Sequence, residues 1–90
     1  MKEKKSNSVT HFEPETIVDG ISVEFTRIVD SSGTVVNGRI VKSEMNVGDI
    51  SYDNNNDFLI LRLKPYSSLT DEETAAVHAA VPGYLKEMLS

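Results

Sequence analysis

The sequence DNNND is the stretch whose residue types and spacing most resemble a metal site. Asp53, Asn55 and Asp57 stand at alternate positions, as the oxygen ligands do at positions one, three and five of a helix-loop-helix calcium loop. That loop also needs Gly at its sixth position and a bidentate Glu at its twelfth, where this chain has Phe58 and Lys64. We therefore interpret the stretch as a polar hairpin turn and predict no metal site.

Residues that could perform catalysis are few and lack partners in the sequence. His78 has no ligand at the fourth position after it, because Pro82 stands there, and His11 lies in a polar segment. No Gly-x-Ser-x-Gly elbow surrounds a serine, and the glycines form neither a phosphate loop nor a dinucleotide fingerprint. There is no cysteine. We therefore predict no catalytic residues, no cofactor and no enzymatic activity.

The composition describes one small, acidic domain. The chain has 90 residues and a net charge of −5, which opposes nonspecific binding to nucleic acid or anionic lipid. The lysines near the N-terminus are not followed by the apolar run of a signal peptide, and no apolar stretch approaches the ~20 residues that cross a bilayer. We expect a soluble, cytoplasmic protein without a membrane partner.

The chain divides into a polar N-terminal segment and one folded domain. Residues 1–15 are charged and aperiodic, which predicts a flexible arm, and residues 16–90 form the single domain. Within it, Ile21, Val23 and Phe25 alternate with polar residues, which indicates a strand with one buried face. The sequence DSSG that follows indicates a hairpin turn.

A second strand is expected over residues 34–42, but the dipeptide Asn37-Gly38 interrupts it. This dipeptide tolerates left-handed backbone, so it forms either the hairpin turn itself or a bulge within a longer strand, and the bulge is favoured because a turn would leave a very short strand. The sequence NVGD, residues 46–49, is expected to form the next turn, and residues 50–53 a short third strand.

The fourth strand, residues 58–64, is apolar on both of its faces. Leu59, Leu61 and Leu63 share one face and are the best candidates for the floor of the core. Phe58 and Ile60 share the other face with two cations. The strand therefore needs cover on both sides.

The clearest element is a C-terminal helix that begins at Asp71. Thr70 and Glu73 have the spacing of a capping box, and the acids of the first turn suit the positive end of the helix dipole. One apolar stripe is formed by Val77, Val81, Leu85 and Met88. Pro82 interrupts the helix, so we expect a kink or a break there.

These elements predict an α+β fold: an antiparallel β-meander of three or four strands, followed by a C-terminal helix packed on one sheet face. The uncovered face would then serve a noncatalytic protein-protein interaction or regulatory accessory module, expected to be a homodimer. The predicted partner-binding residues are Tyr52, Phe58, Ile60, Arg62 and Lys64. The competing cover is the chain's own segment FEPETIV, residues 12–18, folded back over the patch.

The alternative function is binding of single-stranded nucleic acid. Five of the six cations beyond residue 5 fall in predicted strands, so the uncovered face could be locally basic: Arg27, Arg39, Lys42, Arg62 and Lys64. Phe58 on that face, with Tyr52 as a neighbour, could then stack against bases. The acidic total charge and the absence of an aromatic-rich strand motif stand against this function.

Overall fold

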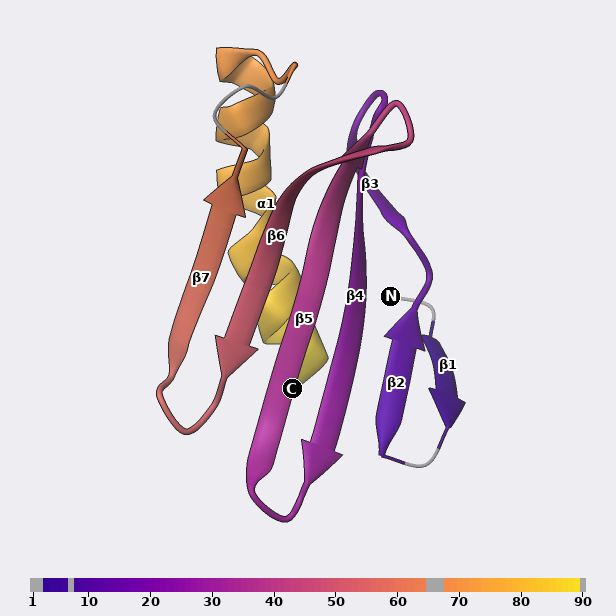
Figure 1. Cartoon of the computed structure of the whole chain (residues 1–90), viewed down its shortest axis with the longest axis vertical. Helices are drawn as coiled ribbons and strands as arrows, with labels where there is room; N and C mark the ends of the chain where they lie inside the picture. The colour runs from indigo at the N-terminus through magenta and orange to yellow at the C-terminus, as the bar shows by residue number, and fades with distance from the viewer. Residues whose placement is uncertain (1–2, 7, 65–67, 90) are drawn as a thin grey trace.

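The computed structural model of the chain describes residues 3–6, 8–64 and 68–89. These ranges contain seven strands and one helix: β1 (Glu3–Ser6), β2 (Val9–Phe12), β3 (Glu15–Val18), β4 (Ile21–Asp30), β5 (Gly33–Lys42), β6 (Met45–Asp53), β7 (Phe58–Leu63) and α1 (Asp71–Leu89). The strands form one sheet in the order β1-β2-β4-β5-β6-β7, with β3 paired to β4 (Figure 1). Every pairing is antiparallel. The α+β class and the C-terminal helix are confirmed.

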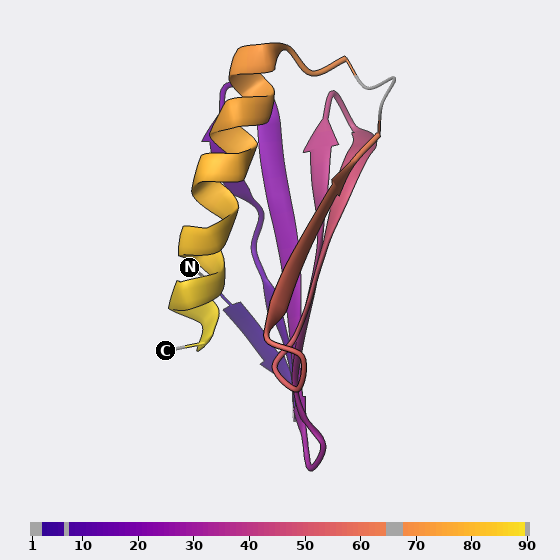
Figure 2. The ribbon, with the colours of Figure 1, turned by 90° about the vertical axis from the view of Figure 1, so that its left-hand side faces the viewer.

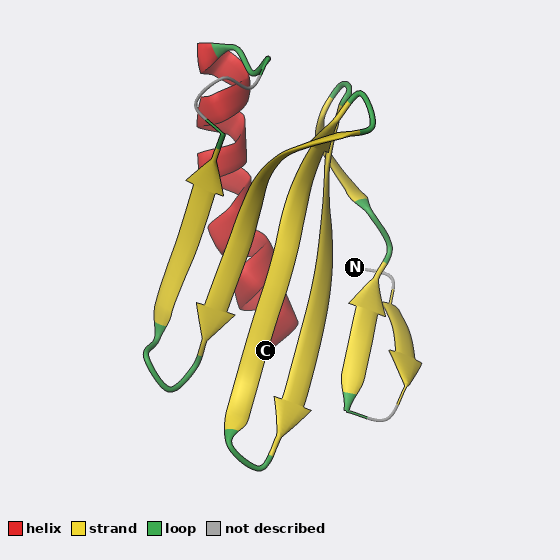
Figure 3. Cartoon of the chain, viewed as in Figure 1, coloured by secondary structure: helices red, strands yellow, loops and turns green. Residues whose placement is uncertain are grey.

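The sheet and the helix form two layers. Helix α1 lies against one face of the sheet, which we call the helix face (Figure 2). No other element of the described chain lies on the opposite face, which we call the open face (Figures 2 and 3). The one-sided cover predicted from the sequence is therefore confirmed.

The expected count of three or four strands is too low, because three short strands precede β4. Strands β2 and β3 both pair with β4, at Thr26 to Ile28 and at Ile21 to Val23 respectively. Pro14 lies between them and has no amide donor for the ladder. The structure thus forms strands within residues 1–15, where the sequence indicated a flexible arm, and the polar composition of this segment concealed them.

The hairpin turns follow the sequence prediction in part. Residues 31 and 32 close the β4–β5 hairpin, as the sequence DSSG predicted. The next turn lies at Ser43 and Glu44, whose φ angles are 51° and 65°, as a hairpin turn of the mirror-image type requires. The turn expected at residues 46–49 is wrong, because these residues belong to β6.

The dipeptide Asn37-Gly38 is neither a turn nor a bulge. Both residues pair in regular register with β4 and with β6. The register shift lies instead between β5 and β6 at Ile40 and Val41, where β6 has the extra residue Val47. Gly38 has a packing role: a Cβ atom there would lie 2.8 Å from Cδ1 of Phe25. The glycine therefore makes room for an aromatic ring that packs over it from β4.

The core lies between the helix face and α1. Most of its strand residues come from the alternating positions of β4, β5 and β6, and Phe12 of β2 joins them; the fully buried ones include Ile21, Val23, Val36 and Ile40. All four residues of the predicted helical stripe are buried against them: Val77, Val81, Leu85 and Met88. The predicted burial of the helical stripe is confirmed, and so is that of the alternating residues Ile21, Val23 and Phe25 of β4.

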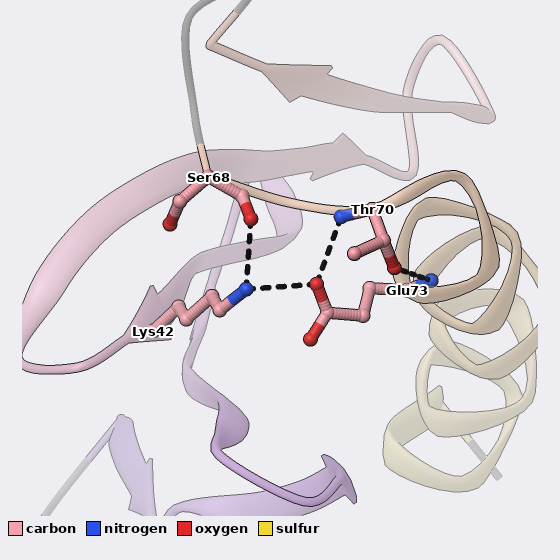
Figure 4. Close-up of polar contacts among 4 residues, drawn as sticks. All are labelled: Lys42, Ser68, Thr70 and Glu73. Carbon is pink, nitrogen blue, oxygen red and sulfur yellow. Dashed lines mark hydrogen bonds and ion pairs between the residues drawn. The ribbon is translucent and has the colours of Figure 1, made fainter.

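The capping box forms as predicted and is tied to the sheet (Figure 4). The Thr70 amide donates to Oε1 of Glu73 at 2.8 Å, and the Glu73 amide donates to Oγ1 of Thr70 at 3.1 Å. Lys42 of β5 donates to the same Glu73 oxygen and to the Ser68 carbonyl, each at 2.8 Å. The hydrogen bond from Lys42 is the main cause of a lowered pKa of the Glu73 carboxyl group, and the hydrogen bond from the Thr70 amide lowers this pKa further.

Helix α1 is a single element from Asp71 to Leu89 that includes Pro82. The break predicted at this residue is therefore wrong, and the structure does not show the kink. Pro82 is exposed, so the carbonyl group that loses its amide partner faces the solvent side of the helix, where water can bond to it. At the other end, Arg27 of β4 donates to the carbonyl of Met88.

Candidate functional site

The open face of β7 carries two large apolar side chains that lie in solvent. Phe58 is 71% exposed and Ile60 52% exposed. They point to this face because side chains alternate along a strand, and Leu59, Leu61 and Leu63 point to the helix face. The predicted division of this strand into two faces is confirmed.

The three leucines are less buried than expected. Each is only partly buried and packs at the margin of the core. The reason is their position on β7, which ends the strand order, while the fully buried side chains come from the inner strands. The leucines therefore lie on the correct face but do not form the floor of the core.

The register of the sheet aligns the open-face side chains in three rows across the strands. One row is apolar except for Asp53: Val9, Ile28, Val35, Asp53 and Phe58. The second row is polar and ends at Ile60: His11, Thr26, Asn37, Ser51 and Ile60. The third row alternates in charge: Glu24, Arg39, Asp49 and Arg62. These rows could not be predicted from the sequence, because a row depends on the register between strands, which the turns determine.

The charged row is neutralised within the sheet. Arg39 Nε lies 2.8 Å from Oε2 of Glu24. Arg62 donates two hydrogen bonds, from Nε and Nη2, to the two carboxylate oxygens of Asp49, each at 2.8 Å. This bidentate contact lowers the pKa of the Asp49 carboxyl group and raises the pKa of the Arg62 guanidinium. The row therefore presents paired charges to a partner rather than a basic patch.

The predicted partner-binding residues do not all lie together. Phe58, Ile60 and Arg62 share the open face of β7, and Lys64 is exposed just beyond the end of the strand. Tyr52 lies on the helix face, where it is 7% exposed and its hydroxyl donates to Asp57 at 2.8 Å. That hydrogen bond is the main cause of the raised pKa of the Tyr52 hydroxyl. The expected place of Tyr52 beside Phe58 is therefore wrong.

Two of the five cations expected on the open face lie on the helix face instead. Arg27 stacks on Phe12, with its guanidinium carbon 5.3 Å from the ring centroid. Lys42 contacts the start of α1, as described above. Because Arg39 and Arg62 are paired with acids, Lys64 is the one remaining member of the predicted basic set on or near the open face.

The N-terminal segment does not cover the patch on β7. Phe12 is buried in the core on the helix face, and Ile17 and Val18 pack against the same core. Strands β2 and β3 pair with β4, and strands β5 and β6 separate β4 from β7 (Figure 1). The alternative in which residues 12–18 fold over Phe58 and Ile60 is therefore wrong.

The Asp/Asn cluster joins two hairpins through hydrogen bonds. Asp53 accepts from the Asn55 amide at 2.9 Å, which shapes the turn. Asn54 reaches the neighbouring β4–β5 hairpin, where its Oδ1 accepts from the Thr34 amide and its own amide donates to the Thr34 carbonyl, both at 3.0 Å. One carboxylate oxygen of Asp53 is thus engaged within its own turn, and Asn54 holds the two turns together.

Groups with catalytic potential are scattered. His11 Nδ1 lies 3.2 Å from Oγ1 of Thr26 on the open face, while His78 is exposed on α1. A shallow depression on the open face is lined by residues that already hold the Glu24–Arg39 ion pair: Glu24, Thr26, Asn37, Gly38 and Arg39. In the described ranges, no three or more His, Cys, Asp or Glu side chains are grouped so that they could hold a metal ion.

Two further findings bear on function. The one helix in the described part of the chain lacks the length and apolar character needed to cross a membrane. In comparisons with family models, curated proteins and solved structures, nothing was found that matches the chain.

Proposed function

We propose that the protein is a small noncatalytic interaction module that binds a protein partner through the open face of the sheet, as a homodimer. The observation that carries this proposal is the exposure of Phe58 and Ile60 side by side on one strand of a 90-residue protein. Covering a large apolar side chain is worth about 1.5 to 3 kcal/mol, so two adjacent ones favour association. A two-fold pairing is the commonest way to cover such a patch.

The electrostatics of the open face favour a protein partner over a nucleic acid. Phosphate binding needs cations that are free to replace counterions, and Arg39 and Arg62 are instead paired with Glu24 and Asp49. Phe58 is the one large aromatic ring that the described residues expose on this face, which is too few for a stacking platform. The face resembles the surface of a protein interface, with apolar residues beside internally paired charges.

Sedimentation velocity on the parent and on two charged variants tests this proposal. Phe58→Glu places a charge in the apolar patch. Met45→Glu places the same charge outside the patch, at a residue that is 68% exposed and begins β6, whereas Phe58 lies opposite the last residue of β6. We expect the parent and Met45→Glu to associate between about 1 µM and about 1 mM, the range of small interfaces, and Phe58→Glu to remain monomeric. Circular dichroism and a thermal melt establish that all three proteins are folded.

Two results would contradict the proposal. One is a parent protein that is monomeric throughout this concentration range. The other is saturable binding of a single-stranded oligonucleotide that weakens steeply as salt rises and is lost in Phe58→Glu, because that behaviour is typical of a phosphate-binding surface.

A further inference from the structure

We infer that the partner is a second copy of this chain, and that β7 of each copy pairs antiparallel with β7 of the other along their free edges, with the two-fold axis at Leu61. This inference rests on the function proposed above, a homodimer that covers Phe58 and Ile60, and it moves the contact from the open face alone to the free edge of β7 beside these two residues. It begins with the position of β7, which ends the strand order and pairs with β6 alone in the part of the chain that the structure describes.

The backbone of β7 has three residues whose polar groups point to the free edge. The Lys64 amide donates to the Val47 carbonyl of β6, and the carbonyl of Arg62 also faces β6, since a Cβ atom on Gly48 would lie 2.6 Å from its oxygen. Amide and carbonyl groups alternate in direction along a strand. The amide and carbonyl groups of the even-numbered residues of β7 therefore face β6, and those of the odd-numbered residues point away from it: Leu59, Leu61 and Leu63.

The side chains of β7 also need cover on both faces of the sheet. Phe58 and Ile60 are exposed on the open face, and the three leucines are only partly buried on the helix face. A partner stacked on the open face would cover Phe58 and Ile60 but would leave the leucines and the free edge unchanged. A second β7 on the free edge contacts all three: its leucines lie beside the leucines on the helix face, and its open-face side chains lie beside Phe58 and Ile60.

Hydrogen bonding and charge select one register for this pairing. With the axis at Leu61, all three outward-pointing residues pair, because Leu59 lies opposite Leu63 of the second copy and Leu61 opposite itself. The axis at Ile60 leaves Leu63 opposite Asp57, which is in the turn with a φ of 56°. The axis at Arg62 places two guanidinium groups opposite each other, which is destabilising.

In the selected register, the cations oppose apolar residues. Arg62 lies opposite Ile60 of the second copy, and Lys64 lies opposite Phe58, where a cation can contact the ring face. In Figure 1 the first turns of α1 lie above the tip of β7, so the two-fold axis places the starts of the two helices at opposite ends of the paired strands.

The chain contains no cysteine, so single cysteine variants test the geometry directly. In the selected register the two copies of residue 61 form a hydrogen-bonded pair with Cα atoms about 5.5 Å apart, which a disulfide can bridge. The two copies of residue 60 lie on a diagonal of about 7 to 8 Å, at or beyond that limit. Under mild oxidation at a concentration where the parent associates, we expect about tenfold more covalent dimer from Leu61→Cys than from Ile60→Cys.

A third variant separates this inference from the function on which it rests. Asn37→Cys lies in the middle of the open face, on β5, far from the free edge. A parent that associates but is cross-linked best through Asn37→Cys pairs face to face; this result overturns edge pairing and leaves the proposed function intact. Best cross-linking through Ile60→Cys overturns the register and the inference with it. A monomeric parent, with no variant cross-linked above the level of random collision, overturns both.

Discussion

Gly38 lies directly opposite Phe25 in the ladder between β4 and β5, and the Phe25 ring occupies the space that a side chain at position 38 would need. The ring is held in place from the other side by Tyr84 of α1, whose ring centroid is 6.0 Å away at an interplanar angle of 58°. A small residue on the strand thus allows an aromatic pair to join the sheet to the helix.

This contact makes Gly38→Ala a destabilising substitution. The new Cβ atom would lie 2.8 Å from Phe25 Cδ1 and 3.0 Å from the Glu24 carbonyl oxygen, and the backbone atom cannot move aside. We expect a loss of about 1 to 3 kcal/mol in the free energy of unfolding, measured by urea denaturation. Gly83→Ala is the matched control, because a Cβ atom there has no neighbour within 4 Å. It should stabilise α1 by up to about 1 kcal/mol; equal effects of the two substitutions would refute the packing role of Gly38.

The contact between Lys42 and Glu73 predicts a pH-dependent contribution to stability. The pKa of the Glu73 carboxyl group is lowered in the folded state, and the hydrogen bond from Lys42 is the main cause. The resulting stabilisation is therefore present above the carboxyl's unfolded-state pKa, about 4.3, and is lost as the pH falls through the lower folded-state value. The free energy of unfolding of the parent should exceed that of Lys42→Met at pH 7, and the difference should shrink below about pH 4.

Urea denaturation at a series of pH values measures this difference. Lys86→Met, which changes an exposed lysine in the last turn of the same helix, serves as the control for the loss of one positive charge. A difference between the parent and Lys42→Met that stays constant from pH 7 to pH 3 would show that Lys42 acts through packing rather than through the Glu73 carboxylate.

The capping box predicts a moderate effect for Thr70→Ala. The substitution removes the hydroxyl oxygen that accepts from the Glu73 amide, and the expected cost is about 1 kcal/mol. Thr74→Ala, one turn into the same helix, should leave stability unchanged or slightly higher, because alanine has the greater helix propensity. Thermal denaturation followed by circular dichroism compares the two, and a larger loss from Thr74→Ala would contradict the assigned cap.

The turn between β6 and β7 should not respond to calcium. Asp53 and Asp57 already accept hydrogen bonds from the Asn55 amide and from the Tyr52 hydroxyl. In a titration with millimolar calcium followed by NMR, we expect the amide signals of residues 53–57 to keep their positions. Saturable shifts confined to Asp53, Asn55 and Asp57 would show that the turn binds the ion after all.

Local patterns in the sequence were enough to predict the elements that depend on neighbouring residues. The period of two in β4 and β7, the spacing of Thr70 and Glu73, and the apolar stripe of α1 are each confirmed. These features were readable because an alternation, a cap and a helical stripe each involve residues only a few positions apart. The sequence likewise identified Phe58 and Ile60 as apolar residues facing away from the helix.

The tertiary structure decided whatever depends on pairing between distant segments. Strands β2 and β3 carry weak local signals and exist because β4 offers them a partner. From the sequence, Arg39 and Arg62 were predicted to be part of a basic face, but the register places an acid opposite each of them. Tyr52 was predicted to lie beside Phe58, but the Tyr52 side chain points to the helix face and the Phe58 side chain to the open face. The register of an antiparallel sheet is determined by turns and bulges elsewhere in the chain, so no short stretch of sequence contains it.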